Sequence, residues 1–370
     1  MNRTVSIYLD LVRFLAAVLV LLTHLAYSRF SGGILLPLRT YGNDAVMIFF
    51  VLSGFVIAHV ATHRDHDIKV YFLNRLARIY SVAIPCIVLT VVLDQLGRAW
   101  NPEAYNGFWY VDAQPVLRIL TAVSFTHELW FSSWRLFTNG PYWSVGYEFF
   151  YYAIFAALWY LKGPSRWWMA GVLSLIAGPK ILLLFPIWLA GVQVYRVGQR
   201  SPVGPRLGWA LFLGSFAGYV AFRASGLRDV LLQWSYDQWG RLFVEGSLRW
   251  SNEFLSSYLL GALVIANFVG VQAIAPSLSR LLEPHAARIQ DWAGYTFSIY
   301  LFHYPILQFL AATGLFEPTS PWAVSALFVL TLLACRGLGR YTEKRKDVAR
   351  RLLQKIVRLA HEPISHPGIR

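Results

Sequence analysis

The sequence predicts an all-α protein: a polytopic membrane bundle of about ten transmembrane helices, one re-entrant or interfacial segment and a C-terminal basic amphipathic helix. Three observations predict this fold class. Hydrophobic residues make up 56% of the 370 residues, charged residues only 14%, and the mean hydropathy is +0.47. Apolar runs of about 20 residues, long enough to cross a bilayer, recur from end to end. The 15 Trp and 20 Tyr suit the two membrane interfaces, where rings with a polar edge are favoured.

Loop charge decides how many of the eleven apolar runs cross the membrane. The run at 116–130 is short and contains Arg118, His127 and Glu128. If it does not cross and the N-terminus is cytoplasmic, seventeen Lys and Arg lie inside and five outside, whereas crossing reverses these counts and violates the positive-inside rule. We therefore predict ten spans, with 116–130 re-entrant or interfacial and covered by protein or water. The eleven runs are 7–27, 42–60, 79–96, 116–130, 142–161, 166–178, 180–197, 207–224, 254–271, 291–311 and 320–338.

Residues 1–338 form one predicted transmembrane domain, and residues 339–370 a cytoplasmic basic amphipathic tail. The tail carries one apolar stripe, and its Lys and Arg account for much of the net charge of +14. It therefore predicts contact with the anionic cytoplasmic leaflet, and no nucleic acid partner is needed to explain the charge. The stripe consists of Val348, Leu352, Leu353, Ile356 and Val357.

The remaining patterns point to no metal and to no common soluble enzyme class. Cys86 and Cys335 lie inside apolar runs and offer neither a disulfide framework nor a zinc spacing. Phosphate-binding, dinucleotide and nucleophile-elbow motifs are absent from the sequence. The longest outer loop, roughly 225–253, mixes charges with Trp. It could contact a sugar, but the pattern favours an ordered, solvated connection.

The stretch YLDLVRFLAAVLVLLTHLAY (8–27) holds Asp10, Arg13 and His24 in an otherwise apolar span. Asp10 and Arg13 are three residues apart and can pair on one face. Arg13 and His24 are eleven apart, so they lie within about 20° on the same face and about 16 Å apart along the axis. Such residues usually face the bundle interior. The stripe predicts a polar path from the cytoplasm, against the alternative of a structural ion pair plus a core histidine. The functional interpretation is favoured only for His24, whose proton moves near neutral pH.

Two further stretches carry candidate site residues. In VYFLNRLARIYSVAIP (70–85), Arg75 and Arg78 lie at the cytoplasmic edge of a span, where they either anchor the helix end or hold phosphates. In NGPYWSVGYEFFYYAIF (139–155), Glu148 is expected at a depth similar to that of His24, and a carboxylate beside a histidine would orient a general base. Ser144 is more simply a helix-entry residue bonded to the backbone than a nucleophile.

Five stretches, in chain order, carry a resemblance to a known family. They are LDLVRFLAAVLVLLTH with Arg13 and His24, FFVLSGFVI (49–57) with Ser53 and Gly54, YFLNRLARIY with Arg75 and Arg78, YWSVGYEFFYY with Trp143, Ser144 and Glu148, and GYTFSIYLFHYPI (294–306) with Ser298, Tyr300, His303 and Pro305. Together they resemble the acyltransferase-3 family, integral-membrane acyltransferases that modify bacterial surface glycans, periplasmic glucans and some small molecules. The resemblance covers nearly the whole chain.

The chain also departs from the family pattern at three positions. Ser81 stands where the family often has Pro, Phe149 replaces a common second acid, and Met47 replaces an Asp. The two missing acids leave the charge partner of His24 open and make Glu148 the only transferred candidate in its segment.

The resemblance implies transfer of an acyl group, acetyl or succinyl, from cytoplasmic acyl-CoA to a hydroxyl of a cell-surface or secreted glycan or its lipid-linked oligosaccharide precursor. His24 would be the general base or the acyl carrier. The setting would be the bacterial inner membrane, with both termini cytoplasmic, and acyl-CoA a co-substrate rather than a bound cofactor. The implied site is catalytic at His24, Glu148, Arg13 and Asp10, cofactor-binding at Arg75 and Arg78, and substrate-binding at Trp143, Ser144, His303 and Tyr300.

Two other functions stay open from the sequence. A transporter or flippase would use the polar residues of the spans as a permeation path, with His303 and Glu148 as proton relays. The chain has no paired halves of similar pattern, and its basic inner edge suits an anionic donor. A catalytically silent relative is the third hypothesis. The sequence leaves open the acyl group, the acceptor and the oligomeric state.

Overall fold

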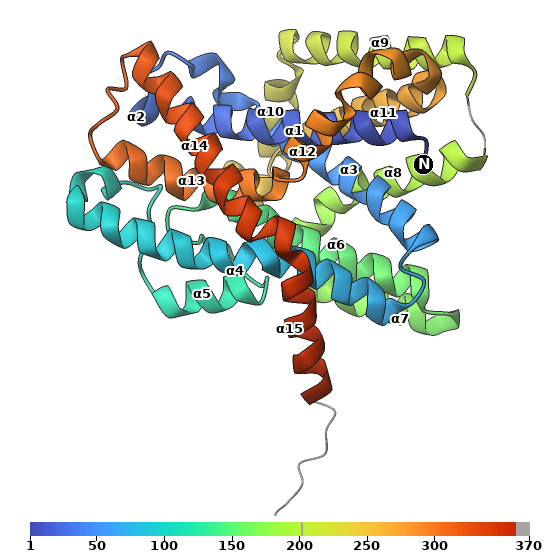
Figure 1. Cartoon of the computed structure of the whole chain (residues 1–370), viewed down its shortest axis with the longest axis horizontal. Coiled ribbons are helices and arrows are strands. Elements are labelled where there is room, and N and C mark those ends of the chain that lie inside the picture. The colour runs from blue at the N-terminus through green and yellow to red at the C-terminus, as the bar shows by residue number, and fades with distance from the viewer. Residues whose placement is uncertain (201–202, 360–370) are drawn as a thin grey trace, which may run out of the picture.

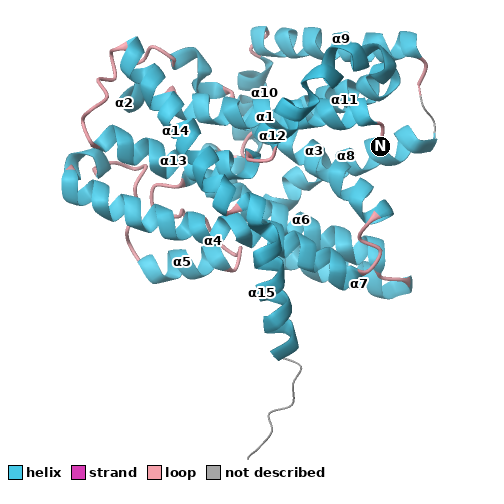
Figure 2. Cartoon of the chain, viewed as in Figure 1, coloured by secondary structure: helices cyan, strands magenta, loops and turns pink. Residues whose placement is uncertain are grey.

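The computed structural model describes residues 1–200 and 203–359, with side chains to residue 355, so part of the predicted tail (360–370) lies outside the described residues. In the described chain, fifteen α-helices are joined by loops and short turns and no β-strand forms, which confirms the all-α prediction (Figure 2). The helices are α1 (Arg3–Leu25), α2 (Ser28–Ser31), α3 (Gly42–His63), α4 (Ile68–Trp100), α5 (Pro115–Val123), α6 (Trp143–Tyr160), α7 (Gly163–Ala177), α8 (Pro179–Arg200), α9 (Pro205–Ala224), α10 (Leu227–Trp239), α11 (Phe254–Leu282), α12 (Ala286–Ala293), α13 (Thr296–Ala312), α14 (Pro321–Tyr341) and α15 (Lys346–Leu359).

The helices indicate a multi-pass membrane protein. Seven stretches are long and apolar enough to cross a bilayer, and they contain α1, α3, α4, α8, α9, α11 and α14. Helices α6, α7 and α13 coincide with the three other runs predicted to cross, but they are shorter or more polar. The count of ten spans therefore stays a prediction.

The run at 116–130 forms only the nine-residue helix α5, about 14 Å long and too short to cross a bilayer. Beyond α5 the backbone is irregular, yet Arg118 and Glu128 find partners within the protein, whereas Nδ1 of His127 is buried without one among the described residues. The Arg118 guanidinium donates to the carbonyls of Ala113 (2.7 Å) and Arg135 (2.8 Å). The Glu128 carboxylate pairs with Lys180, and both side chains are fully buried. Such pairing is what a re-entrant or interfacial segment requires. Its depth in the membrane stays a prediction.

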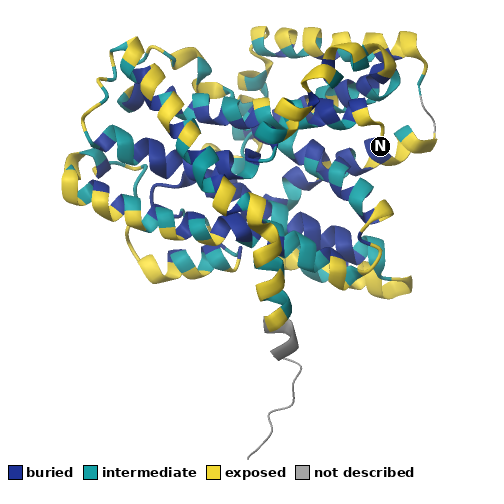
Figure 3. Cartoon of the chain, in the orientation of Figure 1, coloured by how far each residue is buried: buried dark blue, intermediate teal, exposed yellow. Residues whose placement is uncertain are grey.

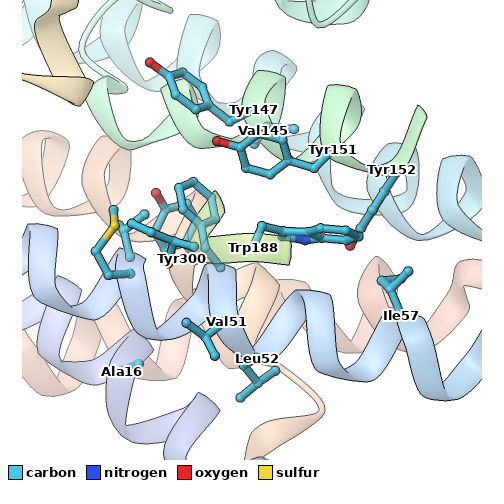
Figure 4. Close-up of a cluster of buried hydrophobic side chains, with 14 of the residues drawn as sticks. Ala16, Val51, Leu52, Ile57, Val145, Tyr147, Tyr151, Tyr152, Trp188 and Tyr300 are labelled. Carbon is cyan, nitrogen blue, oxygen red and sulfur yellow. The ribbon is translucent and has the colours of Figure 1, made fainter. Parts of the chain in front are cut away.

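Two glycines let α3 and α8 cross in backbone contact. A Cβ atom on Gly54 of α3 would lie 1.9 Å from the Trp188 carbonyl oxygen, and one on Gly191 of α8 would lie 2.0 Å from that of Val51. Small residues of this kind are what membrane helices use for close approach. Figure 4 shows the Trp188 ring between the α3 ribbon, which carries Val51, and the α6 ribbon, which carries Tyr151. This crossing forms one wall of the central region.

Helices from both ends of the chain meet around the centre of the bundle. Helix α1 packs against α3, α12 and α13, and α13 packs in turn against α4 and α14. Figure 1 shows α9 and α11 on one side of this centre and α4 to α7 on the other, and Figure 3 shows the buried residues concentrated between them. The candidate site residues come from α1, α3, α4, α6 and α13.

Helix α15 forms at the predicted amphipathic tail and projects away from the bundle (Figure 1). Its apolar residues Val348, Leu352 and Leu353 line a groove with Tyr80 and Ile84 of α4. The helix therefore leaves the bundle beside the third span. Ile356 and Val357, predicted for the same stripe, have side chains outside those described, and contact with the leaflet stays a prediction.

We expect Gly54→Ala to lower the stability of the folded protein by about 1–3 kcal/mol, because the new methyl group meets backbone atoms that cannot move aside. Thermal unfolding in detergent micelles measures the change. Gly171→Ala in α7 is the matched control, since nothing lies within 4 Å of its new Cβ. Equal melting temperatures for the two variants would contradict the close crossing of α3 and α8.

Candidate active site

Two cavities lie back to back at the centre of the bundle. Val46 lines both of them, and the neighbouring residues Trp143 and Ser144 line one each. The inner cavity is lined by Arg13, Val46, Phe49, Phe50, Leu52, Ser53, Val56, Arg78, Ser144, Glu148, Thr296, Phe297, Tyr300 and Glu343. The outer cavity is lined by Thr23, His24, Tyr27, Arg39, Thr40, Gly42, Asn43, Val46, Trp143, Arg228, Glu245, Arg249, Trp250, Asn252 and Glu253.

His24 lines the outer cavity and is hydrogen-bonded to a second histidine behind it. Nδ1 of His303 lies 2.9 Å from the Ile299 carbonyl oxygen, which can only accept, so in the neutral ring Nδ1 carries the proton and Nε2 is the acceptor. Nδ1 of His24 lies 2.8 Å from the Val20 carbonyl and 3.1 Å from Nε2 of His303. It must therefore carry the proton as well. The neutral tautomer leaves Nε2 of His24 as an unprotonated nitrogen.

Aromatic edges hold this pair of imidazoles in place. The rings of Tyr304 and Tyr27 meet His24 edge-on, with centroids 5.0 Å and 5.6 Å away. The Tyr304 hydroxyl accepts a hydrogen bond from Arg29, which also donates to Gln308 Oε1 at 3.3 Å. The guanidinium of Arg29 therefore fixes the ring that packs against His24. The sequence alone did not suggest Arg29 or Tyr304, because nothing ties them to His24 in the chain.

Glu148 lies in the inner cavity, not beside His24. Its carboxylate accepts hydrogen bonds from the Tyr152 hydroxyl and from Ser53 Oγ, the latter at 3.3 Å. Ser53 Oγ in turn accepts from the Trp188 indole at 3.1 Å. In the described chain, the hydrogen-bond partners of His24 are the Val20 carbonyl and His303. The sequence left the charge partner of His24 open, and in the structure a second imidazole, not the Glu148 carboxylate, lies beside it.

The arginines predicted near the cytoplasm divide between two environments. Arg13 and Arg78 both line the inner cavity. Arg13 donates to Asp10 at 2.8 Å, so the predicted i, i+3 pair forms. Arg75 instead faces Asp65, with 3.5 Å between Nη2 and Oδ2. Arg75 and Arg78 therefore do not present a joined pair of guanidiniums to this cavity.

Glu343, which the sequence analysis did not select, closes the inner cavity. Its carboxylate accepts from the amides of Phe297 (3.3 Å) and Ser298 (2.9 Å) and from Ser298 Oγ (2.9 Å). These amides belong to the first turn of α13, where helix N–H groups lack partners within the helix. Glu343 follows the last apolar run in a stretch that reads only as the start of a charged tail.

Ser144 and Tyr300 join the inner cavity wall by a side-chain hydrogen bond. Ser144 Oγ lies 2.8 Å from the Tyr300 hydroxyl, which also donates to the Pro141 carbonyl at 3.0 Å. Ser144 caps no backbone group, so the predicted backbone bond at the helix entry is wrong. His303 is fully buried and lines neither cavity, whereas Trp143 lines the outer one.

The loop at 225–253 helps to form the outer cavity, although the sequence favours a plain solvated connection there. Trp250 stacks on Trp143, with ring centroids 5.4 Å apart and planes 7° apart. Its indole N–H donates to Glu128 Oε1 at 3.2 Å, and Glu128 is held by buried Lys180. The buried ion pair therefore holds Trp250 of this loop at the outer cavity.

Comparison with known proteins adds the following. The sequence model of a family described as "Acyltransferase domain", acyltransferase-3, matches residues 6–340. Acyltransferase MdmB of Streptomyces mycarofaciens is 30% identical over 189 residues, which cover 47% of this chain and 46% of that protein. An O-acetyl transferase of Shigella phage Sf6 is 23% identical over 340 residues, covering 86% of this chain and 91% of that protein. No solved structure matches the chain.

We expect Glu128→Gln or Lys180→Met alone to destabilise the protein by about 3–5 kcal/mol, because each leaves the other charge buried without its partner. The double variant E128Q/K180M should recover part of that loss. Thermal unfolding, followed by tryptophan fluorescence, measures both effects. The control is Arg241→Gln, which breaks the exposed Arg241–Glu245 pair and should cost no more than about 1 kcal/mol. A double variant less stable than both single variants would count against the pairing.

Proposed function

Because the chain belongs to the acyltransferase-3 family, we propose that this multi-pass membrane acyltransferase is an acyl-CoA-dependent O-acyltransferase with His24 at its reactive centre. The acyl group, acetyl or succinyl, would pass from cytoplasmic acyl-CoA to a hydroxyl of a surface or secreted glycan or its lipid-linked precursor. The relative from Shigella phage Sf6 aligns with most of this chain and is an O-acetyl transferase, which supports the proposed class of reaction.

The observation that carries the proposal is the tautomer of His24. Its Nδ1–H is engaged by the Val20 carbonyl and by His303, so Nε2 is available as a base at the outer cavity. Nε2 takes the proton of the acceptor hydroxyl while the oxygen attacks the thioester carbonyl carbon. The C–O bond forms, the C–S bond breaks, and the CoA thiolate leaves with the proton that the imidazolium returns. Positioning of the base by a second group is the arrangement that such catalysis uses.

The inner cavity suits the donor. Its wall is largely apolar, as the acyl and pantetheine chain would require, and Arg13 and Arg78 contribute two guanidiniums. Guanidinium groups bind phosphate bidentately, so we assign Arg78, with Arg13 beside it, to the CoA phosphates. Arg75, which is paired with Asp65, would contribute to the donor site at the same cytoplasmic edge of α4.

The thioester has to meet the acceptor across the layer between the two cavities. That layer contains Val46, which lines both, and Ser144, which is bonded to Tyr300. Two routes use the same nitrogen. In the first, the acceptor attacks the thioester directly, with His24 as base. In the second, Nε2 attacks the thioester carbonyl and the CoA thiolate leaves. The acceptor oxygen then attacks the acyl-imidazole, the C–N bond breaks, and the hydroxyl proton passes through the freed Nε2 to the solution that holds the thiolate.

Family membership favours this enzyme over the transporter hypothesis. We place the protein in the bacterial inner membrane with both termini cytoplasmic.

We expect His24→Ala to abolish acyl transfer, because no other histidine lines the described outer cavity and its two carboxylates are paired with arginines. The assay is incorporation of label from radiolabelled acetyl-CoA by purified protein in lipid nanodiscs. The control is His66→Ala, an exposed histidine that should leave transfer unchanged. Transfer at the wild-type rate by a correctly inserted His24→Ala variant would reject the assignment.

We expect Arg78→Ala to weaken acetyl-CoA binding roughly tenfold or more, because a charge-assisted hydrogen bond to phosphate is lost. Equilibrium binding of acetyl-CoA to the purified protein measures this change. Arg64→Ala, at an exposed position after α3, serves as the matched control. Unchanged donor affinity in Arg78→Ala would remove Arg78 from the phosphate site.

A further inference from the structure

The outer cavity carries positive charge that its own carboxylates do not neutralise. Of the two carboxylates in its lining, Glu253 pairs with Arg228 (2.6 Å) and Glu245 with Arg241 (3.0 Å), which lies outside the lining. Arg39 and Arg249 also line the cavity. Across the described chain, neither of their guanidiniums forms an ion pair or donates a hydrogen bond. Two cationic groups thus face the cavity of His24 without an acidic partner.

Arg249 is held in a backbone conformation that non-glycine residues rarely adopt, with φ of 51° and ψ of −111°. Such strain persists only where neighbouring contacts fix the chain, and it collects at binding sites. The contacts are present in the next two residues. Trp250 donates to Glu128 (3.2 Å), and Ser251 Oγ donates to the Lys180 carbonyl (2.7 Å). The buried ion pair therefore holds the loop that presents Arg249.

The same cavity offers surfaces for a sugar. The stacked indoles of Trp143 and Trp250 both belong to its lining, together with the amide side chains of Asn43 and Asn252. Aromatic faces and a few polar groups are a common combination in small-molecule sites. Because His24 lines this cavity too, a molecule that fills it brings its hydroxyl groups to the reactive nitrogen.

We propose that the outer cavity selects an acceptor that carries an anionic oxyacid group, a carboxylate or a phosphate, bound by Arg249 and Arg39. Guanidinium groups bind these oxyanions in a planar, bidentate manner. The acceptor would be an acidic sugar or a sugar joined to phosphate, with its hydroxyl at His24. This inference rests on the proposed function and names its acceptor class.

The test separates acceptors by charge. Glycans, lipid-linked oligosaccharides and small glycosides are extracted from cells of the native host that lack the protein, and anion exchange divides them into neutral and anionic pools. Purified protein in nanodiscs then receives each pool with radiolabelled acetyl-CoA. We expect label in the anionic pool. Amidation of the pool with carbodiimide removes carboxylate charge and leaves phosphate, so loss of labelling identifies a carboxylate and retention a phosphate.

Arginine variants test the assigned residues. Arg249→Gln and Arg39→Gln should each lower the initial rate on dilute anionic acceptor about tenfold. Arg64→Gln, at an exposed position outside the cavity lining, should behave as wild type.

Three results would overturn the anionic-acceptor proposal while leaving the acyltransferase proposal standing. They are label in the neutral pool alone, label in neither pool while acetyl-CoA is still hydrolysed, and wild-type rates for both Arg249→Gln and Arg39→Gln. Absence of any turnover of acetyl-CoA and of succinyl-CoA, with or without acceptor, would overturn both proposals.

Discussion

A polar side chain buried in a membrane bundle has to find its hydrogen-bond partners within the protein, and this constraint shapes the whole centre of the chain. His24 and His303 meet it by giving each Nδ1 proton to a carbonyl of the same helix. The pairing then has a chemical consequence, since it fixes which nitrogen of His24 remains a base. The same two hydrogen bonds satisfy the requirement of the membrane and leave one nitrogen of His24 free, as its proposed role as a base requires.

The same constraint explains why the charges of this chain gather in two separate groups. Arg13, Arg78, Glu148 and Glu343 surround the inner cavity, and three arginines and two glutamates line the outer one. Between them stands a thin layer with Val46 and the Ser144–Tyr300 hydrogen bond. In the proposed reaction this arrangement would keep the donor and the acceptor in separate cavities, with His24 on the acceptor side.

The sequence predicted best those features that depend on residues near one another in the chain. Helix positions follow from runs of apolar residues, and the Asp10–Arg13 pair follows from helix geometry. Contacts between distant segments do not follow in this way. The contact of His24 with His303 joins residues 279 positions apart, and the sequence pattern left the partner of His24 open. Glu343 was missed, and the loop of Arg249 was taken as a solvated connection in preference to a sugar contact, because each lies in a charged stretch. Only contacts with another helix or with a buried ion pair fix these two stretches.

Glu343 lies beyond the last apolar run and still belongs to the packed bundle, which hydropathy alone does not reveal. The last apolar run stops near residue 338, which makes a cut at that point look harmless. A chain shortened there would lose the carboxylate that covers the first amides of α13, the helix that also carries His303. Those amides would then lack a hydrogen-bond acceptor at the wall of the inner cavity, where a helix N-terminus favours the binding of anions. The folded bundle therefore includes residues beyond the last apolar run, in a stretch whose charge alone indicates a separate tail.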